Sequence, residues 1–131
     1  MRSLNILIVD DHGGFRILIR ELLGGCAAIL QSGEPQFVEC ASAEEALAHN
    51  ARMPPDLIIM DLCLPGMDGN ECIRQLRPSA PRAIIIMVTC LRDPAVGERA
   101  LAAGADAVVF KDDLSLIPLL MRECLAPVQP A

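Results

Sequence analysis

The sequence predicts an α/β fold in which a five-stranded parallel sheet is covered by helices on both faces. Five short runs of aliphatic and β-branched residues recur along the chain, and a segment with helical spacing of apolar residues follows each of them. Three of these runs are apolar with almost no alternation, which is typical of strands buried on both faces. Strands that alternate with helices through short connections form right-handed crossovers, and therefore a parallel sheet.

The expected strands are bounded by polar or turn-forming residues. They are LNILIV (4–9), FVEC (37–40), DLIIM (56–60), AIIIMV (83–88) and AVVF (107–110). The expected helices follow them in order. They occupy residues 15–23, 42–50, 69–76, 94–104 and 115–124.

Two of these helices carry clear signals at their ends. Ser42 with Glu45 three residues later forms a capping box, in which each side chain binds a backbone N–H at the start of the helix. Asp93 is an N-cap residue, and Pro94 suits the first helical turn because its missing N–H would be unpaired there. Gly104 can end the same helix in a left-handed conformation.

Length and composition predict one domain. A chain of 131 residues, 53% of them hydrophobic and 21% charged, can build a single core and is too short for two ordinary domains. We expect the domain to cover residues 1–125 and residues 126–131 to form a tail or the start of a linker.

Charge and hydropathy exclude several function classes. The net charge of −6 means that this domain should repel nucleic acid. The apolar runs are far shorter than the ~18 residues that a membrane helix needs, and no signal-peptide pattern follows Met1, so we expect a cytoplasmic protein. The six cysteines show no C-x-x-C pair or metal-type spacing, which favours reduced thiols.

Reactive polar residues stand at the ends of four of the five expected strands. Asp10 and Asp11 follow the first strand, Asp61 the third, Thr89 the fourth and Lys111 the fifth. The carboxyl ends of parallel strands share one edge of the sheet, and ligands of such folds bind there. We therefore expect these five side chains to converge.

Three converging carboxylates predict a metal site. At intermediate dielectric, the repulsion between such carboxylates costs roughly several kcal/mol unless a cation neutralises them. Mg²⁺ prefers oxygen ligands and commonly uses one or two carboxylates together with water. We expect Asp11 and Asp61 as direct ligands, Asp10 through water, and the backbone carbonyl of Cys63 as a further ligand.

Asp61 is also the candidate nucleophile, because aspartate can accept a phosphoryl group in covalent catalysis. Pro65 and Gly66 form a tight turn after it and leave its approach open. Thr89 could donate its hydroxyl to one phosphoryl oxygen and Lys111 could pair with another. Lys111 is the chain's only lysine beside ten arginines, and its compact ammonium could bind first the aspartate and then the phosphoryl group.

Taken together, ILIVDDH, DLIIMDLCLPGMDG, AIIIMVT and GADAVVFKD resemble the receiver domain of bacterial two-component response regulators, over residues 4–124. The resemblance implies a flavodoxin-like fold with strand order 2-1-3-4-5, an order carried over from a receiver of this family and not worked out from the pattern. It also implies Mg²⁺ as cofactor and a sensor histidine kinase whose phosphohistidine donates to Asp61. On phosphorylation, Thr89 and the loop after it would rearrange.

The resemblance further implies an output. The face built by residues 94–104, 107–110 and 115–124 would change its affinity for a partner, which can be a second copy of the chain. DDHGGFR and FKDD are similar to receivers of the NarL/FixJ type, which usually precede a helix-turn-helix DNA-binding domain. Such a domain would have to lie outside these residues and would make the function transcriptional control.

Three features depart from the family pattern. Val108 stands three positions before Lys111, where an aromatic residue often couples to the threonine, and Asp112 follows the lysine in place of proline. The connection over residues 25–36 is longer than usual.

Two rival functions and one bystander complete the expectations. A phosphatase of the haloacid-dehalogenase type would also use Mg²⁺ with Asp, Thr and Lys, but it would need an aspartate two residues after the nucleophile, where Cys63 stands. A phosphate-independent interaction module could keep the fold but would not need the complete acidic set. His12 is expected to be a bystander at the start of the first helix, and Cys63 and Cys90 to be packing residues beside the pocket.

Overall fold

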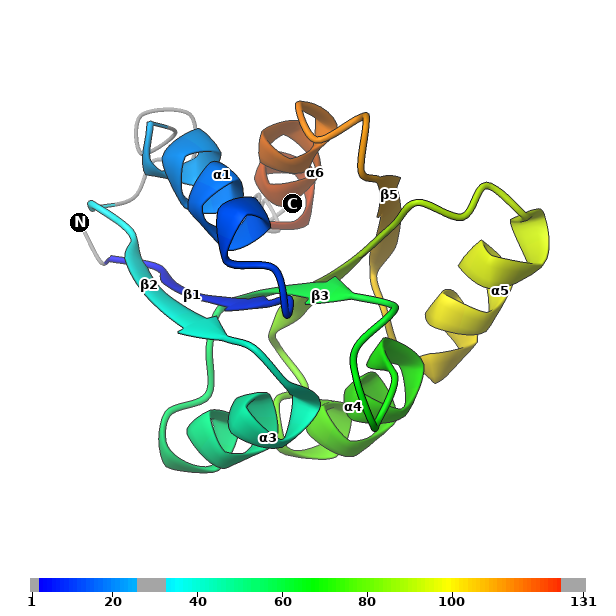
Figure 1. The fold of residues 1–131 in the computed structure, drawn as a ribbon. Coiled ribbons are helices and arrows are strands. Elements are labelled where there is room, and N and C mark those ends of the chain that lie inside the picture. The colour runs from blue at the N-terminus through cyan, green and yellow to red at the C-terminus, as the bar shows by residue number, and fades with distance from the viewer. Residues whose placement is uncertain (1–2, 26–32, 126–131) are drawn as a thin grey trace, which may run out of the picture.

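A computed structural model of the chain describes residues 3–25 and 33–125 (Figure 1). The helices and strands alternate along the chain. They are β1 (Asn5–Val9), α1 (Gly13–Gly24), β2 (Gln36–Cys40), α3 (Ala43–Arg52), β3 (Leu57–Asp61), α4 (Gly69–Leu76), a short 3₁₀ helix (Arg77–Ser79), β4 (Ile84–Thr89), α5 (Pro94–Ala103), β5 (Ala107–Phe110) and α6 (Leu116–Leu125). The expected tail at 126–131 and most of the long connection lie outside the described residues.

The five strands form one parallel sheet in the order β2-β1-β3-β4-β5. The predicted fold class and strand order are confirmed, and the flavodoxin-like architecture with them. Each strand lies within one residue of its predicted bounds, and Asp61 and Thr89 prove to be the last residues of β3 and β4. Strand order reverses between β1 and β3, so the carboxyl ends of these two strands flank the crevice where such folds bind ligands.

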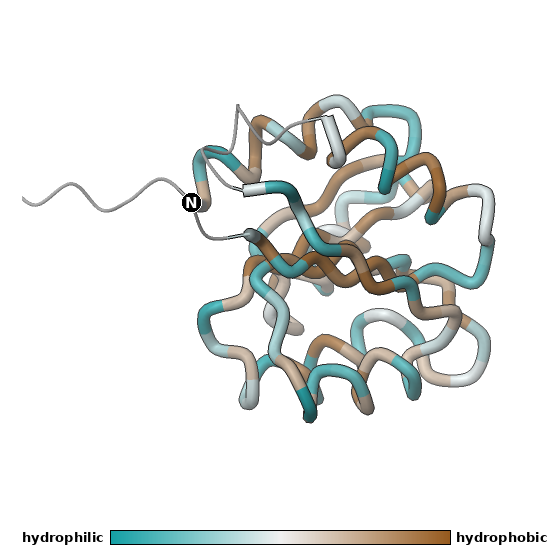
Figure 2. Tube along the Cα trace, turned by 90° about the vertical axis from the view of Figure 1, so that its left-hand side faces the viewer, coloured by the Kyte–Doolittle hydropathy of each residue, from teal (hydrophilic) through white to brown (hydrophobic). Residues whose placement is uncertain are grey.

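Helices cover both faces of the sheet, with α1 and α6 on one face and α3, α4 and α5 on the other (Figure 1). Side chains of a strand alternate between the two faces. In β1, Ile6 and Ile8 therefore pack toward α1 and α6, whereas Leu7 and Val9 pack toward α3, α4 and α5. The hydrophobic stretches meet in the middle layer (Figure 2), which is why β1, β3 and β4 read as continuous apolar runs.

The predicted helix caps are confirmed. Ser42 accepts a hydrogen bond from the Glu45 N–H at 3.2 Å, and Asp93 accepts one from the Ala95 N–H at 2.9 Å. Gly104 ends α5 with φ of 121°, a conformation that favours glycine. The first helix begins at Gly13, two residues earlier than predicted, and the last begins at Leu116. Among the described residues, no helix has the length and apolarity needed to span a bilayer.

Candidate functional site

Asp10 and Asp11 enter the site from the end of β1. Asp10 is completely buried, and its backbone N–H continues the pairing with β2 by donating to the Cys40 carbonyl at 3.0 Å. Asp11 is exposed at the start of the turn into α1. The apolar strand thus holds one carboxylate inside the protein and presents the next one to solvent.

Asp61 ends the central strand β3, between β1 and β4, and only 5% of it is exposed. Burial raises the pKa of its carboxyl above the usual range, the negative charge of Asp10 raises it further, and Lys111 offsets part of this rise. The Cys63 N–H donates to Oδ1 of Asp61 at 3.4 Å. The ionised form of this carboxyl is therefore less favoured than that of an ordinary aspartate, and a further cation would favour it.

Lys111 reaches across the edge of the sheet to both buried carboxylates. Its Nζ lies 3.1 Å from Oδ2 of Asp10 and 3.5 Å from Oδ1 of Asp61. The ammonium also lies 4.4 Å from the centre of the Phe15 ring, a favourable cation–π position. Burial alone would lower the pKa of Lys111, but the hydrogen bond to Asp10 and the charge of Asp61 outweigh that effect, so its pKa is raised and the group stays charged.

Thr89 is buried at the end of β4, the strand next to Asp61. Its hydroxyl oxygen accepts a hydrogen bond from the Leu91 N–H at 3.0 Å, and its carbonyl accepts one from the Lys111 N–H at 3.0 Å. The hydroxyl proton is not used by the Leu91 bond. Thr89 therefore ties the loop after β4 to the site and can still donate a hydrogen bond.

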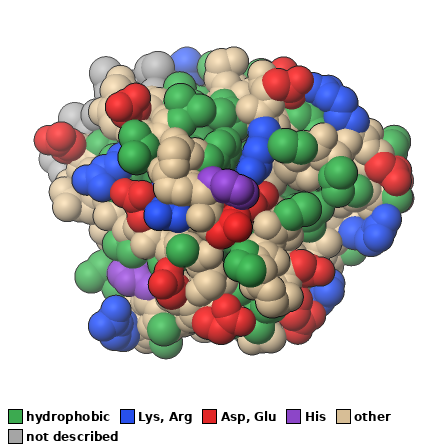
Figure 3. Space-filling model, viewed as in Figure 1, with side chains coloured by type: hydrophobic (Ala, Val, Ile, Leu, Met, Phe, Trp, Pro, Cys, Tyr) green, Lys and Arg blue, Asp and Glu red, His purple; other side chains and the backbone are tan. Residues whose placement is uncertain are grey.

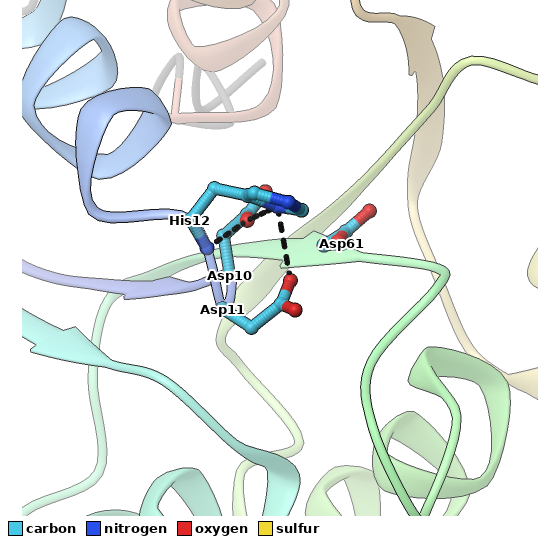
Figure 4. Close-up of side chains that lie close together, drawn as sticks. All are labelled: Asp10, Asp11, His12 and Asp61. Atoms are coloured by element: carbon cyan, nitrogen blue, oxygen red, sulfur yellow. Dashed lines mark hydrogen bonds and ion pairs between the residues drawn. The ribbon is translucent and has the colours of Figure 1, made fainter.

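His12 was expected to be a bystander, and that expectation was wrong. Its ring Nδ1 lies 3.2 Å from Oδ1 of Asp10 and 3.1 Å from Oδ1 of Asp11 (Figure 4). The reason is local, because the His12 N–H donates to Oδ1 of Asp10 at 2.8 Å and folds the chain back over the two carboxylates. On the face shown in Figure 3, acidic and histidine side chains lie together near the centre.

The donor set fits a divalent cation. Each of four side chains offers one ligand atom such that these atoms all lie within 4.8 Å of one another: Asp10, Asp11, His12 and Asp61. Three carboxylates lie together and the Lys111 ammonium contacts two of them, so this lysine alone does not balance their negative charge. Oxygen-rich sets of this kind suit Mg²⁺ or Mn²⁺. The Cys63 carbonyl as a further ligand stays a prediction.

Three residues that support the site were not identified from the sequence. Phe15 holds the Lys111 ammonium, and Arg16 donates to the Asp10 carbonyl at 2.6 Å while Glu39 orients its guanidinium at 3.1 Å. A β-carbon on Gly69 would collide with the Asp61 carbonyl oxygen. Phe15 and Arg16 lie four and five residues after Asp11, where the first turn of α1 returns to the site.

A model of the response regulator receiver domain matches residues 6–117 of the chain. The chain belongs to this family. Receiver domains are regulatory modules of two-component systems and not classical enzymes.

Receiver domains of known proteins are similar over most of the chain. Response regulator protein VraR of Staphylococcus aureus is 36% identical over 109 residues, which cover 83% of this chain and 50% of VraR. The chain therefore spans about half the length of this relative.

Solved structures show the same fold. A two-component response regulator of the LuxR family from Aurantimonas sp. SI85-9A1 superimposes with a TM-score of 0.81 at 31% identity, over 95% of this chain and 86% of that one. Chemotaxis protein CheY4 of Vibrio cholerae gives a TM-score of 0.78 at 25% identity, over 92% and 98% of the two chains.

Proposed function

We propose that this receiver is a phosphorylation-dependent switch in which Asp61 accepts a phosphoryl group from the phosphohistidine of a sensor kinase. The observation that carries the proposal is the Lys111 ammonium, 3.5 Å from Oδ1 of buried Asp61, beside carboxylates that fit a divalent cation. We expect this exchange to take place in the cytoplasm.

The chemistry is an in-line transfer. A carboxylate oxygen of Asp61 attacks phosphorus, the bond between phosphorus and the kinase imidazole breaks, and the imidazole keeps the electron pair. Asp11 and Asp61, with Asp10 through water, would hold a Mg²⁺ ion, whose positive charge would offset the negative charge of the phosphoryl oxygens. The Lys111 ammonium pairs with the Asp61 carboxylate before the transfer and with a phosphoryl oxygen after it.

The proposed output starts at Thr89. When its hydroxyl donates to a phosphoryl oxygen, the loop that is bonded to it through Leu91 must follow. In that loop the Arg92 guanidinium stacks 4.4 Å from the centre of the Phe110 ring and pairs with Asp112. A shift of Thr89 would therefore change the surface formed by α5, β5 and α6.

This surface is the expected contact with a second copy of the chain or with an output domain. Three large apolar side chains on α5 and α6 are about half exposed: Leu101 at 52%, Leu116 at 47% and Leu119 at 54%. The matched residues cover only 50% of VraR, so that relative has a further region, and we propose that the output is transcriptional control by a DNA-binding domain. The net charge of −6 argues against direct DNA binding by the receiver itself.

The proposal is tested by reaction with acetyl phosphate and intact-mass spectrometry. We expect the wild type to gain one phosphoryl group when Mg²⁺ is present and none when the metal is chelated. Asp61→Asn should gain none. Asp68→Asn is the matched control, because it makes the same change of charge at an exposed N-cap that asparagine can also serve, and it should react as the wild type does. Equal modification of wild type and Asp61→Asn would overturn the proposal.

A further inference from the structure

We propose that His12 is a ligand of the divalent cation and gives this receiver a cation preference that an all-oxygen pocket would not have. The inference rests on the proposed function, which requires a cation at the three carboxylates. It adds a nitrogen donor from a residue that the phosphoryl-transfer mechanism does not use.

The separations of the donor atoms are close to those of one coordination shell. For metal–ligand bonds of about 2.1 Å, adjacent ligands of an octahedron lie about 3 Å apart and opposite ligands about 4.2 Å apart. Nδ1 of His12 lies 3.1 Å from Oδ1 of Asp11 and 3.2 Å from Oδ1 of Asp10, and ligand atoms of all four side chains lie within 4.8 Å of one another. Small shifts of the side chains would bring the donor atoms of His12, Asp11 and Asp61 around one ion, with Asp10 bound through water.

The backbone holds His12 in place while its ring stays adjustable. The His12 N–H is bonded to Asp10 at 2.8 Å, and the His12 carbonyl accepts from the Arg16 N–H at 3.2 Å as α1 begins. The side chain is 72% exposed, so it can rotate without disturbing the core. When Nδ1 turns its lone pair to the cation, the ring proton resides on Nε2.

The consequence is a change of cation preference. Carboxylate and carbonyl oxygens suit Mg²⁺, whereas imidazole suits first-row transition ions, whose affinity for such sites rises from Mn²⁺ to Ni²⁺. With His12 as a ligand, the pocket should bind Mn²⁺ and Ni²⁺ more tightly, relative to Mg²⁺, than the three carboxylates alone would. The phosphoryl transfer itself would still depend on Asp61 and Lys111.

The test is pulsed electron paramagnetic resonance of the Mn²⁺-loaded protein, which detects a nitrogen nucleus bound to the ion. The variants are His12→Phe, which keeps a ring and removes the donor, and His49→Phe, which removes the only other histidine of the chain. We expect nitrogen coupling in the wild type and in His49→Phe, and none in His12→Phe with Mn²⁺ still bound. In parallel calorimetry, His12→Phe should weaken Ni²⁺ binding by at least about tenfold and Mg²⁺ binding much less.

The outcomes separate this inference from the proposed function. Mn²⁺ bound to the wild type without nitrogen coupling, or unchanged coupling in His12→Phe, overturns the role of His12 and leaves the carboxylate site standing. No uptake of Mn²⁺, Ni²⁺ or Mg²⁺ by the wild type overturns both, because no cation site would then exist.

Discussion

The buried carboxylate of Asp61 lowers the stability of the folded protein when no cation is bound beside it. This carboxylate is 5% exposed and lies in the same pocket as the carboxylates of Asp10 and Asp11, where the Lys111 ammonium contacts Asp61 and Asp10. The raised pKa of Asp61 expresses this cost, because the folded state holds a proton on this group more tightly than the unfolded chain does. The same charge repulsion favours the binding of a cation at this site.

We predict that Asp61→Asn stabilises the protein at pH 7. Below the unfolded pKa of about 3.9, the aspartate is protonated in both states and costs nothing. As pH rises through the raised folded pKa, ionisation removes stability from the wild type alone. The advantage of asparagine should therefore be full above that pKa and shrink as pH falls toward about 4, with each kcal/mol worth about 4 °C in Tm.

Melting curves over this pH range measure the effect, and Mg²⁺ provides the control. Saturating Mg²⁺ should raise the Tm of the wild type more than that of Asp61→Asn, because only the complete carboxylate set binds the ion tightly. An advantage of asparagine that grows on acidification would contradict the assignment.

The reactive residues were predictable where the sequence places them at strand ends. Asp10, Asp61 and Lys111 were found because a strand's carboxyl end is readable from an apolar run followed by a polar residue. His12 was misjudged because the hydrogen bond from its N–H to Asp10, which holds its ring beside the two carboxylates, leaves no pattern in composition or spacing.

At the level of elements, the start of α4 is fitted against the end of β3. The Gly69 N–H donates to the Leu62 carbonyl at 2.9 Å, and a β-carbon at Gly69 would press on the Asp61 carbonyl oxygen and lie 3.0 Å from Cα of Leu62. This close approach fixes the backbone of the proposed nucleophile. The sequence places Gly69 at the start of a predicted helix, but only the packing shows what it approaches.

We therefore predict that Gly69→Ala destabilises the fold by roughly 1–3 kcal/mol, as overpacking usually does, and slows phosphorylation by displacing Asp61. Gly97→Ala is the matched control, because Gly97 lies in α5 with no atom within 4 Å of the added β-carbon. Alanine has a higher helix propensity than glycine, so the stability of the Gly97→Ala protein should equal that of the wild type or exceed it by up to about 1 kcal/mol. Urea unfolding measures the stability of the two variants, and the acetyl phosphate reaction measures their rate of phosphorylation. Equal effects of the two substitutions would argue against the close approach of Gly69 to Asp61.

The loop after β4 explains how switching could work with Val108 in the usual aromatic position. Val108 packs into the core between the sheet and the helices α3, α4 and α5. The contact between the loop after β4 and the end of β5 is made instead by Arg92, which stacks on Phe110 and pairs with Asp112. This pairing between two separate loops could not be predicted from the sequence, since charged loop residues are common on any surface.

For the whole molecule, the sequence predicts which strands lie in the centre but not their order. β1, β3 and β4 are buried almost throughout, whereas β2 and β5 are only half-buried, as edge strands should be. The order of the three central strands depends on pairing between distant segments and came from the family resemblance. That order brings Asp10 and Asp61 together, and with them the site.

The central claim is that this arrangement forms an acyl phosphate at one aspartate, and chemical trapping tests it most directly. Borohydride reduces an aspartyl phosphate to homoserine, so peptide mapping after reaction with acetyl phosphate and Mg²⁺ should find homoserine at position 61 alone. Homoserine at another acidic position, or none in a protein that has taken up phosphate, would contradict the account.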